Sequence, residues 1–201
     1  MLNVVILGHS YVHWLQQFMQ DNHNCFPAVR ADFDLQMLAG SAPKFYGIRG
    51  ATLRQFHQEG HIMQKIIGHH PTIVVIHLGG NDLDNPTVKP AAVGMSLFEL
   101  AKFISVNSGA TVVLSQVLFR ERWRNHSSSQ GNARVKTLNE FLSAVCQDCD
   151  GIKFWCHRNL WKSKQNLYRS DGVHLSPLGN YKFYRSIRGA ITHYTYKAEG
   201  V

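Results

Sequence analysis

The chain has 201 residues, of which 44% are hydrophobic and 17% charged, and its formal net charge at pH 7 is +8. This length and composition are typical of one globular domain with a full hydrophobic core, so we expect a single domain over residues 1–201. No apolar run reaches the about 18 residues that a membrane span needs, and we expect no secretory leader. The excess of 21 Lys and Arg over 13 Asp and Glu favours polyanionic partners such as nucleic acid or an anionic membrane, although a solubilising surface would have the same charge.

Cysteine usage indicates reduced thiols. Four cysteines are too few for a disulfide scaffold of this length. Cys146 and Cys149 have C-x-x-C spacing, but they stand at the end of an expected helix, whereas a thioredoxin-type site needs them at a helix start. No second pair follows at zinc spacing. We therefore expect an intracellular protein, cytoplasmic or nuclear.

Strand-like and helix-like segments alternate along the chain. Short apolar or β-branched runs predict strands over residues 3–8, 33–38, 72–78, 111–115 and 152–155. Helical patterns occupy residues 11–20, 53–67, 91–107, 132–146 and 177–194, and Gly60 is a position at which the second of them can break. This order predicts an α/β fold, with a parallel sheet of about five strands and helices on both faces.

Residues that acyl transfer needs follow the expected strands. Ser10 comes directly after the first strand, Gly50 lies in the loop after the second, and Asn81 follows the third. Asp171 and His174 come after the last. Taken singly, each has a simpler explanation, because Ser is a good helix N-cap and the others are common in turns. The carboxyl ends of parallel strands meet at one edge, however, so we expect all five residues to lie together.

Their residue types predict a serine hydrolase. The Ser10 hydroxyl would be the nucleophile, and because it is weak at neutral pH it needs an adjacent base, for which His174 is the candidate. Asp171, three residues earlier, would hold the second ring nitrogen of His174 and fix its tautomer. The backbone N–H groups of Ser10 and Gly50 and the side-chain amide of Asn81 would form the oxyanion hole.

Four short blocks show a family resemblance. They are the nucleophile block Gly8-His9-Ser10, the glycine block at Gly50, the asparagine block 79–82 (Gly-Gly-Asn-Asp) and the block 171–174 (Asp-Gly-Val-His). In these blocks the chain resembles the SGNH hydrolase superfamily of GDSL-type esterases and lipases. The resemblance implies a flavodoxin-like, three-layer α/β/α sandwich. It also implies hydrolysis of carboxylic esters, often acetyl or other short acyl groups on lipids or sugars, and it implies no metal or organic cofactor.

One position departs from the family pattern. His9 stands between Gly8 and Ser10, where the family usually has an Asp that shapes the nucleophile turn without belonging to the triad. Followed by Tyr11 and Val12, this block also resembles, over a shorter stretch, the SGNH-like domains encoded by animal retroelements. The alternative hypothesis is a catalytically weak domain of that kind, which binds nucleic acid or an anionic membrane through its basic surface.

A basic segment follows the fourth strand. Residues 120–124 read Arg-Glu-Arg-Trp-Arg, a pattern that can bind nucleic acid or an anionic head group and that is also typical of a solvated loop. Because the segment lies on the edge expected for the triad, we predict that Arg120, Arg122 and Trp123, together with His9, contact the substrate. That substrate would be a small-molecule, lipid or sugar ester.

Overall fold

Five parallel strands form a central sheet in the order β2-β1-β3-β4-β5. They are β1 (Val4–Gly8), β2 (Lys44–Gly47), β3 (Ile73–His77), β4 (Thr111–Ser115) and β5 (Ile152–Trp155). The computed structural model describes residues 2–21, 26, 29–30, 33, 42–56, 60–158, 160 and 166–198. The strand order reverses between β1 and β3, and this is where doubly wound sheets open a ligand crevice at their carboxyl ends.

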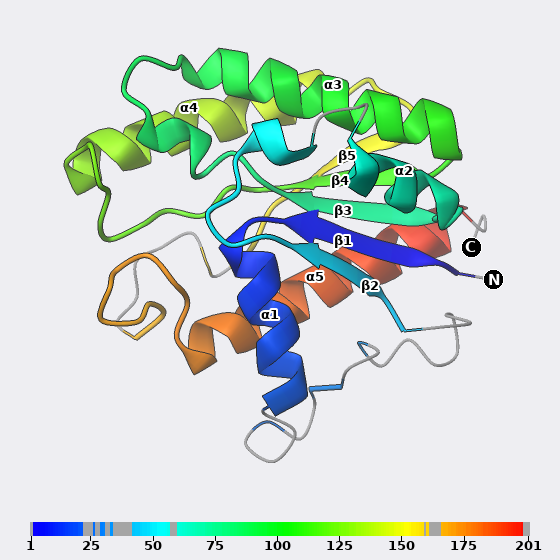
Figure 1. Ribbon diagram of the computed structural model, residues 1–201, viewed down its shortest axis with the longest axis horizontal. Coiled ribbons are helices and arrows are strands. Elements are labelled where there is room, and N and C mark those ends of the chain that lie inside the picture. The colour runs from blue at the N-terminus through cyan, green and yellow to red at the C-terminus, as the bar shows by residue number, and fades with distance from the viewer. Residues whose placement is uncertain are drawn as a thin grey trace.

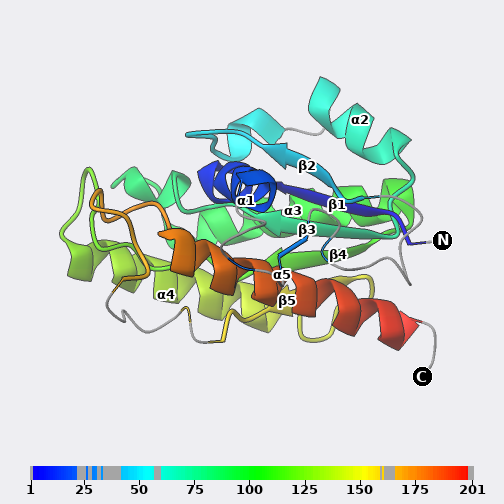
Figure 2. The ribbon, with the colours of Figure 1, turned by 90° about the horizontal axis from the view of Figure 1, so that it is seen from below.

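Helices cover both faces of the sheet (Figure 1). They are α1 (Ser10–Asp21), α2 (His61–Gly68), α3 (Pro90–Ser108), α4 (Ser128–Val145) and α5 (Pro177–Ala198), with short 3-10 turns η1 (Leu53–Phe56) and η2 (Asp82–Asp84). The α1 and α5 helices pack on one face, and α2, α3 and α4 pack on the other (Figure 2). The predicted three-layer α/β/α sandwich is confirmed.

The central strands are buried on both faces. Every residue of β1 and β3 is buried. In β1, Val5 and Leu7 belong to the core beneath α2, α3 and α4, whereas Val4 and Ile6 belong to the core beneath α1 and α5. Full burial of one such side chain stabilises the fold by roughly 1.5–3 kcal/mol. This burial on both faces explains the unbroken apolar runs. Polar residues of the site can therefore follow only where a strand ends.

The second strand lies later in the chain than its predicted position. The sequence favours residues 33–38, of which only Phe33 is among the described residues, whereas β2 is Lys44–Gly47 and pairs with β1. Glycines and a proline within residues 40–50 make the part of the chain around β2 look like a turn. At Gly47, however, an added Cβ would lie 2.3 Å from the backbone nitrogen of His13, so the glycine permits close packing of β2 against α1.

The other boundaries agree with the predictions to within a few residues. The exception is α4, which begins at Ser128 behind a capping box of Ser127 and Gln130. The expected helix 53–67 is divided into η1 and α2, and Gly60, the position at which the sequence allowed a break, is the N-cap of α2. In the part of the chain that the structure describes, Cys146, Cys149 and Cys156 are free thiols. Cys25 lies outside the described residues. Within the same part, no helix is long and apolar enough to cross a membrane.

Candidate active site

Ser10 is the first residue of α1 and follows β1 after a single residue, His9. His9 acts as the cap of the helix, because its carbonyl accepts the N–H of Val12 at 3.0 Å and its Nδ1 atom accepts the N–H of Tyr11 at 3.4 Å. Ser10 is 6% exposed, and its hydroxyl makes no hydrogen bond to any other described residue. The hydroxyl is therefore not used as a helix cap.

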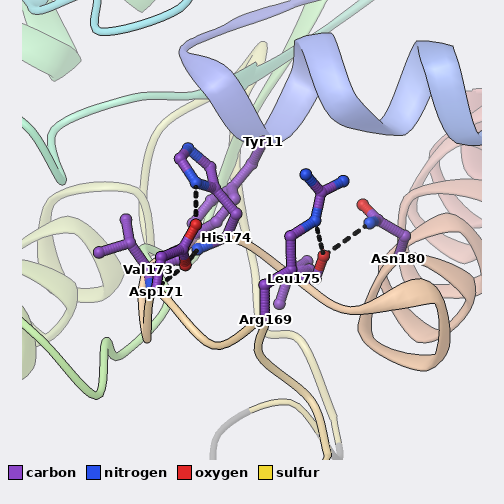
Figure 3. A network of polar contacts seen from close by, with 7 residues as sticks. All are labelled: Tyr11, Arg169, Asp171, Val173, His174, Leu175 and Asn180. Carbon is purple, nitrogen blue, oxygen red and sulfur yellow. Dashed lines mark hydrogen bonds and ion pairs between the residues drawn. The ribbon is translucent and has the colours of Figure 1, made fainter.

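The side chains of Asp171 and His174 lie within ion-pair distance of each other in one turn (Figure 3). The Nδ1 atom of His174 lies 2.8 Å from Oδ2 of Asp171, and Oδ1 accepts the backbone N–H groups of Val173 and His174, each at 2.8 Å. Partial burial alone would raise the pKa of the Asp171 carboxyl, but these hydrogen bonds outweigh it and lower the pKa to about 2. An ionised carboxylate only accepts, so Nδ1 carries the proton and Nε2 is left as a base.

A second contact joins this turn to α1. The hydroxyl of Tyr11, the neighbour of Ser10, donates to the carbonyl of Val173, the neighbour of His174, over 2.5 Å (Figure 3). The ring of Trp14 lies edge-on to that of His174, with 6.1 Å between centroids. Ser10 and His174 make no hydrogen bond to each other in this structure, and such catalytic contacts often tighten only when substrate is bound.

The loops after β2 and β3 are hydrogen-bonded to each other. The side-chain Nδ2 of Asn81 donates to the carbonyl of Ala51 at 2.8 Å, and Asp82 accepts the backbone N–H of Leu53 through Oδ1 at 3.0 Å. Gly50 has a φ of +71°, a left-handed conformation that favours glycine. These contacts bring Gly50 and Asn81, the two predicted oxyanion residues outside α1, onto adjoining loops. The role of Asp82 was missed at the sequence level, although its place in the Gly-Gly-Asn-Asp block was the available signal.

A comparison with protein families shows the family of the chain. The sequence profile of the GDSL-like lipase/acylhydrolase family matches residues 6–182. The chain belongs to this family. Among curated proteins, no sequence matches it. As the resemblance in the four blocks implies, the protein is a GDSL-type, SGNH-fold ester hydrolase.

Solved structures of such hydrolases share the fold at low sequence identity. A GDSL-like lipase of Bacteroides thetaiotaomicron is 21% identical with a TM-score of 0.71, and the match covers 95% of this chain and 88% of that one. A carbohydrate esterase of family 3 from Talaromyces cellulolyticus is 15% identical, with a TM-score of 0.67 and coverage of 96% and 97%. An acetyl esterase determined with an acetate ion is 14% identical, with a TM-score of 0.67 and coverage of 98% and 100%.

The residues predicted to contact substrate in this GDSL-type hydrolase lie at different depths. His9 is fully buried, with its ring 5.0 Å from that of Tyr11 and no exposed surface. Arg120 is 5% exposed. Arg122 is exposed and Trp123 is half-buried. Substrate contact stays a prediction for these residues, and only Arg122 and Trp123 present appreciable surface in the free enzyme.

His9, the departure from the family pattern, is electrically neutral. Burial lowers its pKa well below the ordinary value, and the positive charge of Arg120 lowers it further. Its Nε2 atom is buried without a hydrogen-bond partner. The nucleophile turn of this hydrolase is therefore built on an uncharged side chain where the family usually has a carboxylate.

Two arginines beside Trp14 were missed at the sequence level. The guanidinium groups of Arg49 and Arg169 lie over the ring of Trp14, at 5.4 and 4.3 Å from its centroid. Trp14 stands four residues after Ser10, so one face of α1 carries both. The same ring contacts His174. The spacing from Ser10 and the position of Arg49 next to Gly50 were the available signals.

Proposed function

We propose that this hydrolase cleaves carboxylic esters of short acyl groups, acetyl foremost, with Ser10, His174 and Asp171 as its triad. The observation that carries the proposal is the 2.8 Å pair of Asp171 and His174, held against the start of α1 by the bond from Tyr11 to Val173. A nucleophile, a base and the group that orients the base thereby come from adjoining segments.

In the first half-reaction, Oγ of Ser10 attacks the ester carbonyl carbon while Nε2 of His174 takes the hydroxyl proton. The carbonyl oxygen becomes an oxyanion, which the N–H groups of Ser10 and Gly50 and the amide of Asn81 stabilise. When the carbonyl re-forms, the bond to the alcohol breaks, and His174 gives its proton to the departing alkoxide. Asp171 stabilises the imidazolium that exists between these two transfers.

In the second half-reaction, water attacks the acyl group on Ser10 and gives a proton to Nε2 of His174. The oxyanion forms again at the same donors. Collapse breaks the bond to Oγ, the proton returns to Ser10, and the carboxylic acid leaves. Loss of one oxyanion donor typically lowers the rate by about a hundred- to a thousandfold.

The likeness to an acetyl esterase and to a carbohydrate esterase supports a short acyl group. The GDSL-like lipase among the neighbours is the reason to test longer chains as well. We infer an alcohol that belongs to a small molecule, a lipid or a sugar, as in the family at large. No cofactor has a role in these steps.

The test is hydrolysis of p-nitrophenyl acetate, butyrate and octanoate by the wild type and four variants. We expect the acetate to be turned over fastest, and Ser10→Ala and His174→Ala each to abolish turnover. The matched controls are Ser170→Ala and His61→Ala, which remove an exposed serine and an exposed histidine and should leave the rate unchanged. An inactive wild type, or a Ser10→Ala variant as active as wild type, would contradict the proposal.

A further inference from the structure

Arg120 places a buried positive charge behind Asn81. Its side chain is 5% exposed, and its Nη2 atom donates to Oδ1 of Asn81 at 2.8 Å. Within the described ranges the ion pairs are Lys136 with Glu140 and His174 with Asp171, so no described carboxylate neutralises the guanidinium. A buried charge costs free energy unless it is paired or used. An unpaired guanidinium in the active site therefore calls for a function.

The surrounding residues hold this cation in place. Asn132 of α4 clamps its backbone, because Oδ1 of Asn132 accepts the N–H of Arg120 at 3.0 Å and Nδ2 donates to its carbonyl at 2.9 Å. The ring of Trp123 lies 5.0 Å from the guanidinium carbon. At Gly80, an added Cβ would lie 2.8 Å from Nη2 of Arg120, so the missing side chain makes room for the cation.

Two contacts together fix which way the Asn81 amide points. Arg120 is a donor only, so it requires the amide oxygen. The carbonyl of Ala51 is an acceptor only, so it requires the amide nitrogen. A flipped amide would lose both bonds. One N–H of Nδ2 is used on Ala51, and the second is left to donate to an oxyanion.

The charge also acts on the strength of that donor. A cation 2.8 Å from the amide oxygen draws electron density from the nitrogen and makes its N–H a better hydrogen-bond donor, most strongly where water is excluded. His9 also lies next to Gly80, with its Nε2 atom 3.3 Å from the added Cβ position. Because burial keeps His9 neutral, it adds no second positive charge beside Arg120.

We propose that Arg120 is a positioning residue for the oxyanion hole: it orients the amide of Asn81 and polarises the N–H that meets the oxyanion. The inference rests on the proposed function, since it needs Asn81 to be an oxyanion donor. It gives Arg120 a role that differs from the substrate contact predicted from the sequence. It also separates Arg120 from Arg122 and Arg124 of the same segment, which are exposed.

The test is a double-mutant cycle with Asn81, followed by kinetics on p-nitrophenyl acetate. In the wild-type background, Arg120→Met should lower kcat by about ten- to a hundredfold and change KM by less than about threefold. The reason is that the N–H of Asn81 meets the oxyanion only in the transition state. Arg120→Lys, which keeps the charge, should recover part of kcat. In an Asn81→Ala background, Arg120→Met should lower kcat by less than about twofold, because no amide remains to be oriented.

Arg124→Met is the matched control, since it removes an exposed arginine of the same segment and should leave both constants unchanged. A structural role for Arg120 would lower kcat equally in both backgrounds, and that result would overturn the inference. So would an Arg120→Met enzyme with wild-type kcat. If Arg120→Met does not fold, the Arg120→Lys pair in the two backgrounds decides by the same comparison. The proposed function fails separately, when the wild type itself is inactive or Ser10→Ala is active.

Discussion

The hydroxyl of Tyr11 donates a 2.5 Å hydrogen bond to the carbonyl of Val173, and so joins the residue after Ser10 to the residue before His174. Ser10 follows the first strand and His174 follows the last, so the two arrive from opposite ends of the chain. Tyr11 is itself 1% exposed and belongs to the core beneath α1 and α5. The relative position of Ser10 and His174 thereby depends on a packed side chain.

Removal of the Tyr11 hydroxyl tests whether its bond to Val173 positions Ser10 and His174. In Tyr11→Phe the ring remains, but the Val173 carbonyl loses its donor, and we expect the free energy of unfolding to fall by about 1–2 kcal/mol. We expect kcat to fall by roughly threefold to tenfold, because small misplacements of catalytic groups are costly. Urea denaturation and p-nitrophenyl acetate kinetics measure the two effects. Tyr181→Phe is the control, since that hydroxyl bonds to no described residue; equal effects of both variants would contradict the account.

A substitution at Gly80 tests whether the position of the Arg120 guanidinium matters for catalysis. The Cβ of Gly80→Ala would lie 2.8 Å from Nη2 of Arg120 and 3.3 Å from Nε2 of His9, so the guanidinium must shift from its place in the wild type. We expect kcat to fall at least about tenfold while KM changes little. The control is Gly68→Ala, where an added Cβ meets nothing within 4 Å. A Gly80→Ala enzyme with wild-type kcat would show that the position of Arg120 does not matter.

Three buried histidines make stability depend on pH. His9, His77 and His157 are at most 1% exposed, and each has an Nε2 atom without a partner. Their rings form a row, with 5.2 Å between the centroids of His9 and His77 and 5.8 Å between those of His77 and His157. Burial lowers the pKa of all three, to about 3 for His157. In the folded protein the row is therefore neutral at pH 7.

The sign of the effect follows from these lowered pKa values. The unfolded chain binds protons at its histidines near pH 6.5, whereas the folded protein does not, so stability is complete above that pH and falls as the pH drops toward the folded pKa values. Between pH 7.5 and 5.5 each such group changes the free energy of unfolding by about 1.4 kcal/mol, so three groups change it by about 4 kcal/mol. Urea denaturation at pH 7.5 and 5.5 measures it. We expect the difference to shrink by about a third in His157→Gln, and a wild type equally stable at both values would refute this prediction.

The excess of basic residues supports a separate prediction of binding to nucleic acid or an anionic membrane. Arg122 and Arg124 are exposed on one segment near the active site and could contact phosphate groups. We expect single-stranded RNA and anionic vesicles, titrated separately, to bind at low salt and to lose affinity steeply as salt is added. Arg122→Ser with Arg124→Ser should weaken that binding. If neither ligand binds at low salt, the prediction is wrong.

The fold could be predicted from the sequence where strands are buried on both faces. Such strands read as apolar runs, as at 73–77 and 111–115, and their ends fix where polar residues emerge. The β2 strand could not be found in this way. It is only partly buried along its length, and Gly47 looks like a turn residue when its role is close packing against α1.

The candidate site could be predicted from the types of residue that follow successive strands, but not from contacts between distant loops. The pairing of Asp171 with His174 is local, so three-residue spacing was enough to suggest it. The contacts of Asn81 with Ala51 and Arg120 join loops that are 30 and 39 residues apart along the chain. No local pattern encodes them, so the bond between Arg120 and Asn81 could not be predicted from the sequence. The intracellular location and the resemblance to retroelement domains stay predictions.

The central claim is that Ser10 is an activated nucleophile, and labelling by a fluorophosphonate probe tests it most directly. Only a serine whose hydroxyl is activated by a neighbouring base reacts. We predict stoichiometric modification of the wild type that peptide mass spectrometry assigns to Ser10, and none in Ser10→Ala or His174→Ala. Unlabelled wild-type protein, or labelling that persists in His174→Ala at the wild-type rate, would contradict the account.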